Sequence, residues 1–352
     1  MKTGFSYYFG TAPAQNDSVF EKAKRAGMNY VFTSLHIPEE QVADYARRVR
    51  TFLADCSAAN LNCMVDVSPH TLEKLACTSY EDLKAMGVDY LRLDFGFSDE
   101  EIVRLSQTFH IVLNASTMGR ADVERLRALG ADFSRFVASH NFYPKPLTGL
   151  SLERVAEANR YFKSLGFLTM AFVAGDAVYR GPLFSGLPTV EDQRNTDVLH
   201  NMLALFHETQ SDVVLIGDVD VSDKVWRQID AFNQGFVTLR ADVDASFSHL
   251  KHTLHHDRPD SSPYVVRSVE SGALRAQGVG QHVPKSSTAQ TKVRQKGAIC
   301  LSNEAYLRYE GELEIARLDL PPEERVNIVG QVHPEDLQYL KYIKDGFGFV
   351  LV

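Results

Sequence analysis

The chain has 352 residues, of which 44% are hydrophobic and 23% are charged, and its formal net charge is -8. This length favours two domains over one, and the composition is that of a folded globular protein rather than a disordered one. No long run of Lys and Arg is present to follow a nucleic-acid backbone, so we expect no nucleic-acid partner.

The cysteines and the N-terminal residues bear on the cellular compartment. Cys56, Cys63, Cys77 and Cys300 lack the paired spacing of a structural zinc site, which indicates reduced thiols. The first residues show no secretory signal pattern, and no stretch approaches the ~18 apolar residues that span a bilayer. We therefore expect a cytoplasmic protein with no membrane partner.

Short runs rich in β-branched and aromatic residues alternate with longer segments of helical period, as in repeated βα units. The predicted strands are 4–9, 30–33, 63–67, 90–95, 111–115, 136–141, 168–173 and 213–217. The predicted helices are 18–26, 39–59, 98–108, 120–129, 152–165, 196–207 and 222–233, and Ser98 and Ser151 are expected N-caps. This alternation predicts an α/β fold, a (β/α)8 TIM barrel, with a doubly wound open sheet as the alternative.

The pattern changes after residue 233. A stretch rich in His and Asp, 246–262, is expected to be a solvated loop, and 334–344 carries the one clear helical signal. Between and beyond them lie short strand-like runs at 264–269, 298–301, 313–317, 326–329 and 347–352. The sequence therefore predicts a barrel catalytic domain, 1–235, and a small mostly-β domain, 236–352.

Catalytic groups of a barrel come from the carboxyl ends of its strands. The acidic residues near those ends are Asp66, Asp94, Asp176, Glu191 and Asp218. Asp94, Asp218, Asp66 and Glu191 are the candidate catalytic residues, because glycoside hydrolysis needs one carboxylic acid and one carboxylate. Asp94 ranks first, since Arg92 and Asp94 alternate along one strand and share a face. The alternatives are a buried ion pair for Asp94 and a helix N-cap for Asp218.

Polar and cationic side chains near the same strand ends form the predicted substrate-binding set. Its members are Arg92, Asn114, His140, Asn141, Tyr143, Lys145, Arg180 and Arg194. Loops after strands seven and eight commonly hold phosphate in barrels, which makes Arg180 a candidate for an anion. His140 is read as a hydrogen-bonding residue of the pocket, because no metal-binding spacing accompanies it. We therefore expect neither a metal nor another cofactor.

Several of these stretches, taken in order along the chain, match one family. They are 32–39, 92–98, 113–117, 140–144, 180–183, 186–189 with Glu191 and Arg194, 216–218, 303–304, 308–309, 311–313 and 326–327. In them the chain resembles the bacterial 6-phospho-N-acetylmuramidases. The resemblance implies a TIM barrel followed by a cyclophilin-like domain. It also implies hydrolysis of the β-1,4 bond between N-acetylmuramic acid 6-phosphate and N-acetylglucosamine during cytoplasmic peptidoglycan recycling, with this phosphorylated disaccharide as the small-molecule partner.

The chain departs from the family pattern at three positions. Lys145 and Leu147 stand where Arg and Glu are usual, and Ser302 stands where Asp is usual. Lys in place of Arg keeps the charge but gives up the two-pronged donor geometry.

Two other functions compete with a hydrolase. A barrel isomerase or aldolase acting on a phosphosugar would need a Schiff-base lysine or a metal, and a non-catalytic phosphosugar sensor would lack two facing carboxylates. The resemblance does not assign the acid, the stereochemistry or the oligomeric state.

Overall fold

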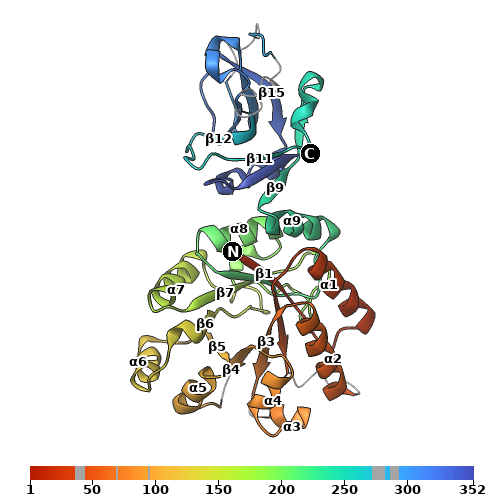
Figure 1. Ribbon diagram of the computed structural model, residues 1–352, viewed down its shortest axis with the longest axis vertical. Coiled ribbons are helices and arrows are strands. Elements are labelled where there is room, and N and C mark those ends of the chain that lie inside the picture. Colours follow the sequence, from red (N-terminus) through yellow and green to blue (C-terminus); the bar gives the residue numbers. More distant parts are fainter. Residues whose placement is uncertain (36–43, 69, 94–95, 272–281, 286–292) are drawn as a thin grey trace. The chain divides into compact units, whose positions relative to one another are not determined.

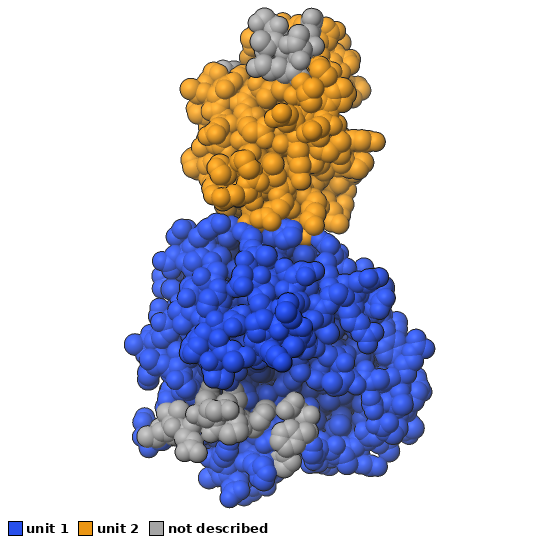
Figure 2. Space-filling view, turned by 180° about the vertical axis from the view of Figure 1, so that it is seen from behind, with its two compact units in different colours: residues 1–230 blue, residues 231–352 orange. Residues whose placement is uncertain are grey.

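The computed structural model describes residues 1–35, 44–68, 70–93, 96–271, 282–285 and 293–352. The chain divides into two units, Met1–Asp230 and Ala231–Val352, which are coloured separately in Figure 2. Asp94, the first candidate for catalysis, lies outside the described residues. Among the helices that are described, none is long and apolar enough to cross a membrane.

The first unit is a closed barrel of eight parallel strands in chain order, surrounded by helices (Figure 1). This confirms the predicted fold class and excludes the open sheet. The strands are β1 (Lys2–Ser6), β2 (Tyr30–Ser34), β3 (Asn62–Val67), β4 (Tyr90–Leu93), β5 (His110–Asn114), β6 (Phe136–Ser139), β7 (Leu168–Val173) and β8 (Val213–Ile216). Pairing of Gly4 with both Tyr30 of β2 and Leu215 of β8 closes the ring.

The helices of this unit follow the predicted order. They are α1 (Pro13–Arg25), α2 (Tyr45–Ala58), α3 (Thr71–Leu75), α4 (Tyr80–Ala85), α5 (Asp99–Ser106), α6 (Arg120–Ala128), α7 (Leu152–Ser164), α8 (Val198–His207) and α9 (Asp223–Asn233). Ser98 and Ser151 are N-caps as predicted, since their hydroxyls accept the N–H groups of Glu101 and Arg154. Helices α3 and α4 were not predicted, because five or six residues are too few to show a helical period.

The barrel interior is filled with apolar side chains from alternate strand positions. The buried cluster contains Tyr30, Phe32, Met64, Tyr90, Val112, Val137, Met170, Phe172, Val213 and Leu215. Because side chains alternate between the two faces of a strand, the residue two positions further along faces the same interior. On β2, β3 and β4 that residue is Ser34, Asp66 and Arg92, so the apolar filling gives way to polar groups at the carboxyl ends.

The second unit is mostly β, as predicted. One sheet has the order β10 (Ala241–Val243), β15 (Val326–Val332), β13 (Ala298–Ser302), β14 (Leu313–Ala316) and β12 (Val265–Arg267). The other has the order β11 (Leu254–His256), β16 (Gly348–Leu351) and β9 (Phe236–Leu239). A cyclophilin-like relationship stays a prediction.

Two predictions for this unit were wrong. The segment 334–344 forms two short 3-10 helices, η5 (Pro334–Asp336) and η6 (Leu340–Tyr342), in place of one helix. The carbonyl oxygens of Leu340 and Ile343 accept from the Arg317 side chain, which takes them out of a helical ladder. The stretch 246–262 contains the 3-10 helix η3 (Ala245–Leu250) and strand β11, and His255 is only 2% exposed.

Candidate active site

Four polar residues at the carboxyl ends of barrel strands form one connected set, called here the Arg92 network. The Nη1 atom of Arg92 lies 2.8 Å from Oδ2 of Asp66, and its Nη2 donates to Oδ1 of Asn141 at 2.6 Å. The hydroxyl of Ser34 donates to the same Asp66 oxygen at 3.3 Å. The sequence predicted Asp66, Arg92 and Asn141 for the site, and the structure brings them together.

The Arg92 network rests directly on the apolar interior and is nearly closed to solvent. The side chains of Arg92 and Asp66 are 11% and 7% exposed. An ion pair with so little solvent is weakly screened, and the planar guanidinium fixes the carboxylate beside it. This end of a barrel is where substrates bind, so the network offers a carboxylate, a guanidinium and an amide to a polar ligand.

Asp218 is not part of that network. Its side chain is fully buried, and its two oxygens accept the backbone N–H groups of Gly175, Arg180 and Leu187 at 2.8 to 3.0 Å. Burial raises the pKa of Asp218, and the three N–H donors oppose that rise. These contacts join the end of β8 to the long loop between β7 and α8, which favours a positioning role for Asp218.

Glu191 and Arg194 form a second fixed unit, called here the Glu191–Arg194 clamp. Glu191 lies in a short 3-10 helix, η2 (Glu191–Gln193), and accepts from Nε and Nη2 of Arg194 at 2.7 and 2.8 Å. The same carboxylate accepts the backbone N–H groups of Leu147 and Gly149, both at 2.8 Å. It therefore pins the loop between β6 and α7 against the loop between β7 and α8.

The guanidinium of Arg194 has five N–H groups, and each one has a partner in the protein. Besides the two bonds to Glu191, Nη1 donates to the carbonyls of Ser185 and Gly186, and Nη2 donates to that of Tyr143, each at 2.9 Å. The side chain is 7% exposed. Arg194 thus has no donor left for a substrate anion, and its contacts support a positioning role rather than the predicted substrate contact.

The clamp requires glycine at position 149. A Cβ atom there would lie 2.7 Å from Oε2 and 2.9 Å from the backbone nitrogen of Glu191. Since the second of these atoms is backbone, the loop would have to move to admit any side chain. Gly149 was not among the predicted site residues, and its close approach to Glu191 is visible only in the folded chain.

The acid stability of the barrel is expected to depend on Glu191. Its hydrogen bonds with Arg194, followed by those from the two backbone N–H groups, lower the pKa of Glu191 to about 2. A folded pKa below the unfolded value means that the stabilisation is complete above about pH 4.5 and is lost as the pH falls toward 2. Between these pH values wild type should lose more stability than Glu191→Gln, which cannot be protonated. Urea unfolding at stepped pH measures this, and parallel pH profiles for both proteins would contradict it.

His140 lies on the outer side of the barrel wall. It is 1% exposed, and its Nε2 lies 2.9 Å from Oδ1 of Asn159 on α7. The amide nitrogen of Asn159 donates to the carbonyl of Thr209 and the hydroxyl of Ser211, so Nε2 of His140 must carry the proton of this bond. This network braces β6 against α7, and it supports a structural role for His140 rather than the predicted substrate contact.

We expect His140 to stay neutral far below the usual range of histidine. Burial lowers its pKa to about 4, against a smaller opposing effect of the bond to Asn159. An NMR pH titration of the imidazole carbons, with the His140 signal assigned by its loss in His140→Asn, should give a midpoint near 4. Because the unfolded chain binds this proton first, His140 also makes folding less favourable as the pH falls from about 6.5 to 4. A midpoint near 6.5 would contradict this assignment.

The remaining predicted residues lie around these groups. The guanidinium of Arg180 lies 4.2 Å from the centroid of the Tyr8 ring, a cation–π contact, and the Tyr8 hydroxyl donates to the carbonyl of Gly217 at 2.6 Å. Asn114 accepts the N–H of Ser116 at 2.9 Å. Tyr143 is half-buried, and Lys145 is exposed. Tyr8 was missed, although it follows the inward-facing Ser6 by two positions.

Asp176, the fifth acidic residue near the strand ends, is bound to the start of α9. Its carboxylate accepts the N–H of Ser222 at 2.6 Å and the hydroxyl of the same residue at 2.7 Å. These bonds explain Asp176 as a cap of the following segment.

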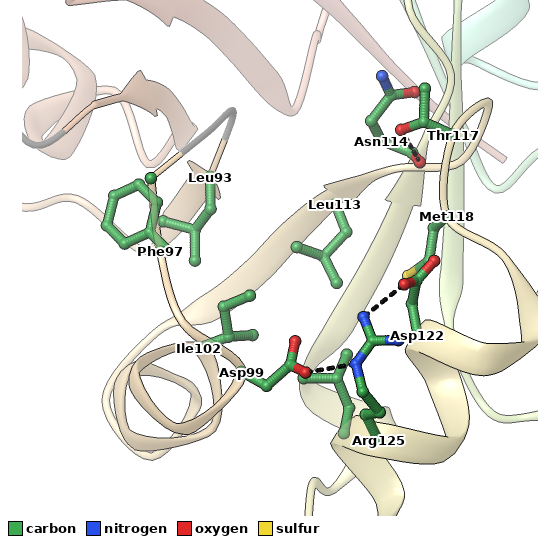
Figure 3. Close-up of a pocket in the computed structure, with 12 residues that line it drawn as sticks. Leu93, Phe97, Asp99, Ile102, Leu113, Asn114, Thr117, Met118, Asp122 and Arg125 are labelled. Carbon is green, nitrogen blue, oxygen red and sulfur yellow. Dashed lines mark hydrogen bonds and ion pairs between the residues drawn. The ribbon is translucent and has the colours of Figure 1, made fainter.

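A pocket of about 250 Å³ lies beside α5 and α6 (Figure 3). Leu93 and Leu113 line it, and both alternate with inward-facing residues, so they point to the outer side of the barrel wall. Its polar edge is closed by Arg125, which bridges Asp99 and Asp122 at 2.7 and 2.6 Å. Asn114 is the one predicted site residue in its lining.

The fold and the charged strand ends together define a (β/α)8-barrel protein with a polar site at the usual catalytic end. Family models described as 6-phospho-N-acetylmuramidase, N-terminal and C-terminal, match residues 3–231 and 237–352. The chain belongs to the 6-phospho-N-acetylmuramidase family, whose name is that of a glycosidase. Among curated proteins, none matches the chain.

Two solved structures resemble the whole chain. One is a conserved protein of unknown function from Enterococcus faecalis, which is 32% identical and has a TM-score of 0.80. The match covers 100% of this chain and 96% of that protein. The other is an uncharacterized protein from B. cereus, which is 25% identical and has a TM-score of 0.74. The match covers 100% of this chain and 99% of that protein. Both extend the likeness over the two units.

Proposed function

We propose that this protein is a 6-phospho-N-acetylmuramidase that acts in the cytoplasm during peptidoglycan recycling. Its substrate would be N-acetylmuramic acid 6-phosphate joined by a β-1,4 bond to N-acetylglucosamine, and the reaction is hydrolysis of that bond. The observation that carries the proposal is the match of both units to the two family models, over nearly the whole chain.

The site residues divide into two groups under this proposal. Asp66 and Arg92 contact the substrate, together with Asn141, because they lie on the inner face at the strand ends. Asp94 supplies the second carboxylate, from its sequence position two residues after Arg92. Asp218 and the Glu191–Arg194 clamp hold the surrounding loops, since their polar atoms are bound to the protein itself.

The substrate carries a phosphate and a lactyl carboxylate, both of which need cationic partners. Arg92 stands at the strand ends, Arg180 is held over Tyr8, and Lys145 is exposed. These three are the proposed anion contacts, whereas Arg194 is fully committed to the protein. Charge-assisted hydrogen bonds from such groups would select the phosphorylated disaccharide.

A hydrolase is favoured over a Schiff-base aldolase by the lysine content of the barrel. Across the eight strands as described, the one lysine is Lys2, at the exposed start of β1. An amine at that end lies away from the carboxyl ends where barrel chemistry takes place.

The test is incubation of the purified protein with the phosphorylated disaccharide and, separately, with its unphosphorylated form, followed by mass spectrometry. We expect release of N-acetylmuramic acid 6-phosphate and N-acetylglucosamine from the first and no cleavage of the second. Cleavage of neither would overturn the proposed activity, and equal cleavage of both would overturn the role of the phosphate contacts.

A further inference from the structure

The second unit contains a pocket with a strongly basic wall, called here the basic pocket. Its volume is about 460 Å³, and its charged lining residues are Lys296, Arg317, Lys341 and Lys344, with no acidic residue among the lining. The chain as a whole carries a net charge of -8, so this concentration of positive charge is a local feature. These cationic side chains would attract an anion in the pocket, although Asp257 and Asp319 are bonded to its walls.

Arg317 fixes the walls of the basic pocket. Its side chain is 10% exposed, and its Nε donates to the carbonyl of Ser262 at 2.9 Å. Its Nη atoms donate to the carbonyls of Leu340 and Ile343, and Nη2 also pairs with Asp257 at 3.3 Å. Arg317 therefore ties together two wall segments that are about 80 residues apart along the chain, 261–263 and 340–344.

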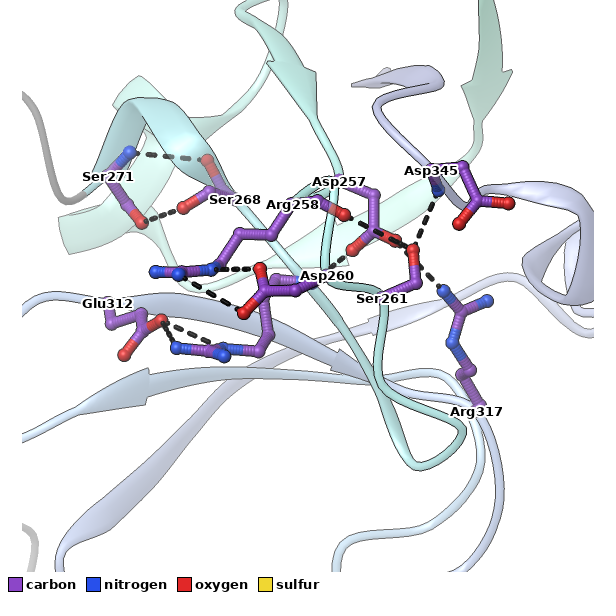
Figure 4. A network of polar contacts seen from close by, with 10 residues as sticks. Asp257, Arg258, Asp260, Ser261, Ser268, Ser271, Glu312, Arg317 and Asp345 are labelled. Atoms are coloured by element: carbon purple, nitrogen blue, oxygen red, sulfur yellow. Dashed lines mark hydrogen bonds and ion pairs between the residues drawn. The ribbon is translucent and has the colours of Figure 1, made fainter.

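A serine makes the second tie between the same walls. The hydroxyl of Ser261 accepts the N–H of Asp345 at 2.7 Å and donates to Asp257, as Figure 4 shows. The two wall segments are thus fixed by bonds within the protein, so a ligand would have to order the lysine side chains but not the backbone. Ordering costs that are met before binding leave more of the interaction free energy for affinity.

Lys296 and Lys344, rather than Arg317, are the groups that would hold an anion. The donors of Arg317 are directed at carbonyls and at Asp257, whereas Lys296 and Lys344 are exposed and show no ion pair in the described residues. The ammonium of Lys341 lies 4.7 Å from the centroid of the Tyr342 ring. Ammonium groups on flexible stems suit a compact, highly charged anion, of which phosphate is the common biological example.

The pocket also presents apolar surface to such a ligand. Leu318 is 41% exposed, and Pro263 beside it is exposed as well. Apolar and cationic side chains in one lining match an organic phosphate, whose carbon skeleton can cover Leu318 while its phosphate meets the lysines. We propose that the basic pocket is a binding site for a small phosphate monoester of a sugar, built wholly from the second unit and separate from the Arg92 network.

The experiment is isothermal titration calorimetry on the full-length protein at low ionic strength, with glucose 6-phosphate and inorganic phosphate as probes. We expect saturable binding of both, tighter for glucose 6-phosphate, and weakened by added salt. Lys296→Glu and Lys344→Glu should each weaken binding at least about tenfold, because each removes a charge-assisted contact and adds repulsion. Leu318→Ser should reduce the preference for glucose 6-phosphate over inorganic phosphate.

Lys74→Glu is the matched control, since Lys74 is an exposed lysine of the first unit with no ion pair in the described part of the chain. It changes the net charge by the same amount and should leave binding unchanged. Equal affinities for Lys296→Glu and Lys74→Glu, or no saturable binding by wild type, would overturn the proposal. Binding by the barrel is distinguished because it would survive both Lys296→Glu and Lys344→Glu, and that survival would also refute the basic pocket as the site.

Discussion

An Asp94→Asn variant is expected to hydrolyse the phosphorylated disaccharide about 10²–10⁴-fold more slowly than wild type, because an acid–base group typically contributes a factor of this size. On β4, Tyr90 belongs to the interior cluster and Arg92 pairs with Asp66 inside the barrel. In the strand that the sequence predicts over 90–95, Asp94 shares a face with Arg92. The substitution removes the charge and the acidity but hardly changes the volume. Turnover measured at saturating substrate, beside a thermal melt, tests the expectation.

Asp192→Asn is the control for that experiment. Asp192 is exposed and lies next to Glu191, so the same chemical change is made near the site without touching the inner face. We expect wild-type turnover from this variant. Full activity of Asp94→Asn with an unchanged melting temperature would remove Asp94 from the mechanism.

Replacing Arg194 by Ala is expected to destabilise the barrel by about 3 kcal/mol or more, because it leaves a mostly buried carboxylate without its partner. Five hydrogen bonds are lost, and Glu191 retains just the N–H groups of Leu147 and Gly149. Arg194→Lys can restore three donors at most and should recover part of the stability. Turnover should fall in both variants as the two loops separate.

Denaturant unfolding followed by tryptophan fluorescence measures this effect on the right part of the chain. Trp226 is the single tryptophan and lies 6% exposed in α9, at the end of the first unit. Arg125→Ala removes a guanidinium that is 56% exposed and paired with two carboxylates, and it should lower the stability far less than Arg194→Ala, because solvent screens exposed ion pairs. Similar losses for Arg194→Ala and Arg125→Ala would contradict the clamp.

The alternation of side chains along a strand explains which members of the Arg92 network could be placed on one face from the sequence. Asp66 and Arg92 follow inward-facing Met64 and Tyr90 by two positions, a period that is visible without a structure. The same rule separates His140 from Asn141, because neighbouring positions face opposite sides. The predicted set includes both residues, and the structure gives them different partners, Asn159 for His140 and Arg92 for Asn141.

The contacts of the Glu191–Arg194 clamp could not be predicted from the sequence in this way. The sequence indicated Glu191 and Arg194 as functional candidates, but their partners are backbone groups at positions 143, 147, 149, 185 and 186. Hydrogen bonds to main-chain groups cannot be recognised from the type of residue that provides them, since every residue carries a carbonyl. Gly149 is the exception, because only the absence of a side chain permits its approach to Glu191.

The Arg92 network and the apolar filling beneath it are separated by one pleat of each strand. Substitutions at Phe32, Met64 or Tyr90 should therefore change the stability of the fold. Substitutions at Ser34, Asp66 or Arg92 should change ligand binding. Substituting every inward-facing position of the barrel should therefore define two layers. Polar residues should unfold the protein in the apolar layer, and substitutions at the carboxyl ends of the strands should change which substrate is accepted. Related barrels can therefore change specificity through the polar layer at the strand ends while keeping the apolar layer unchanged.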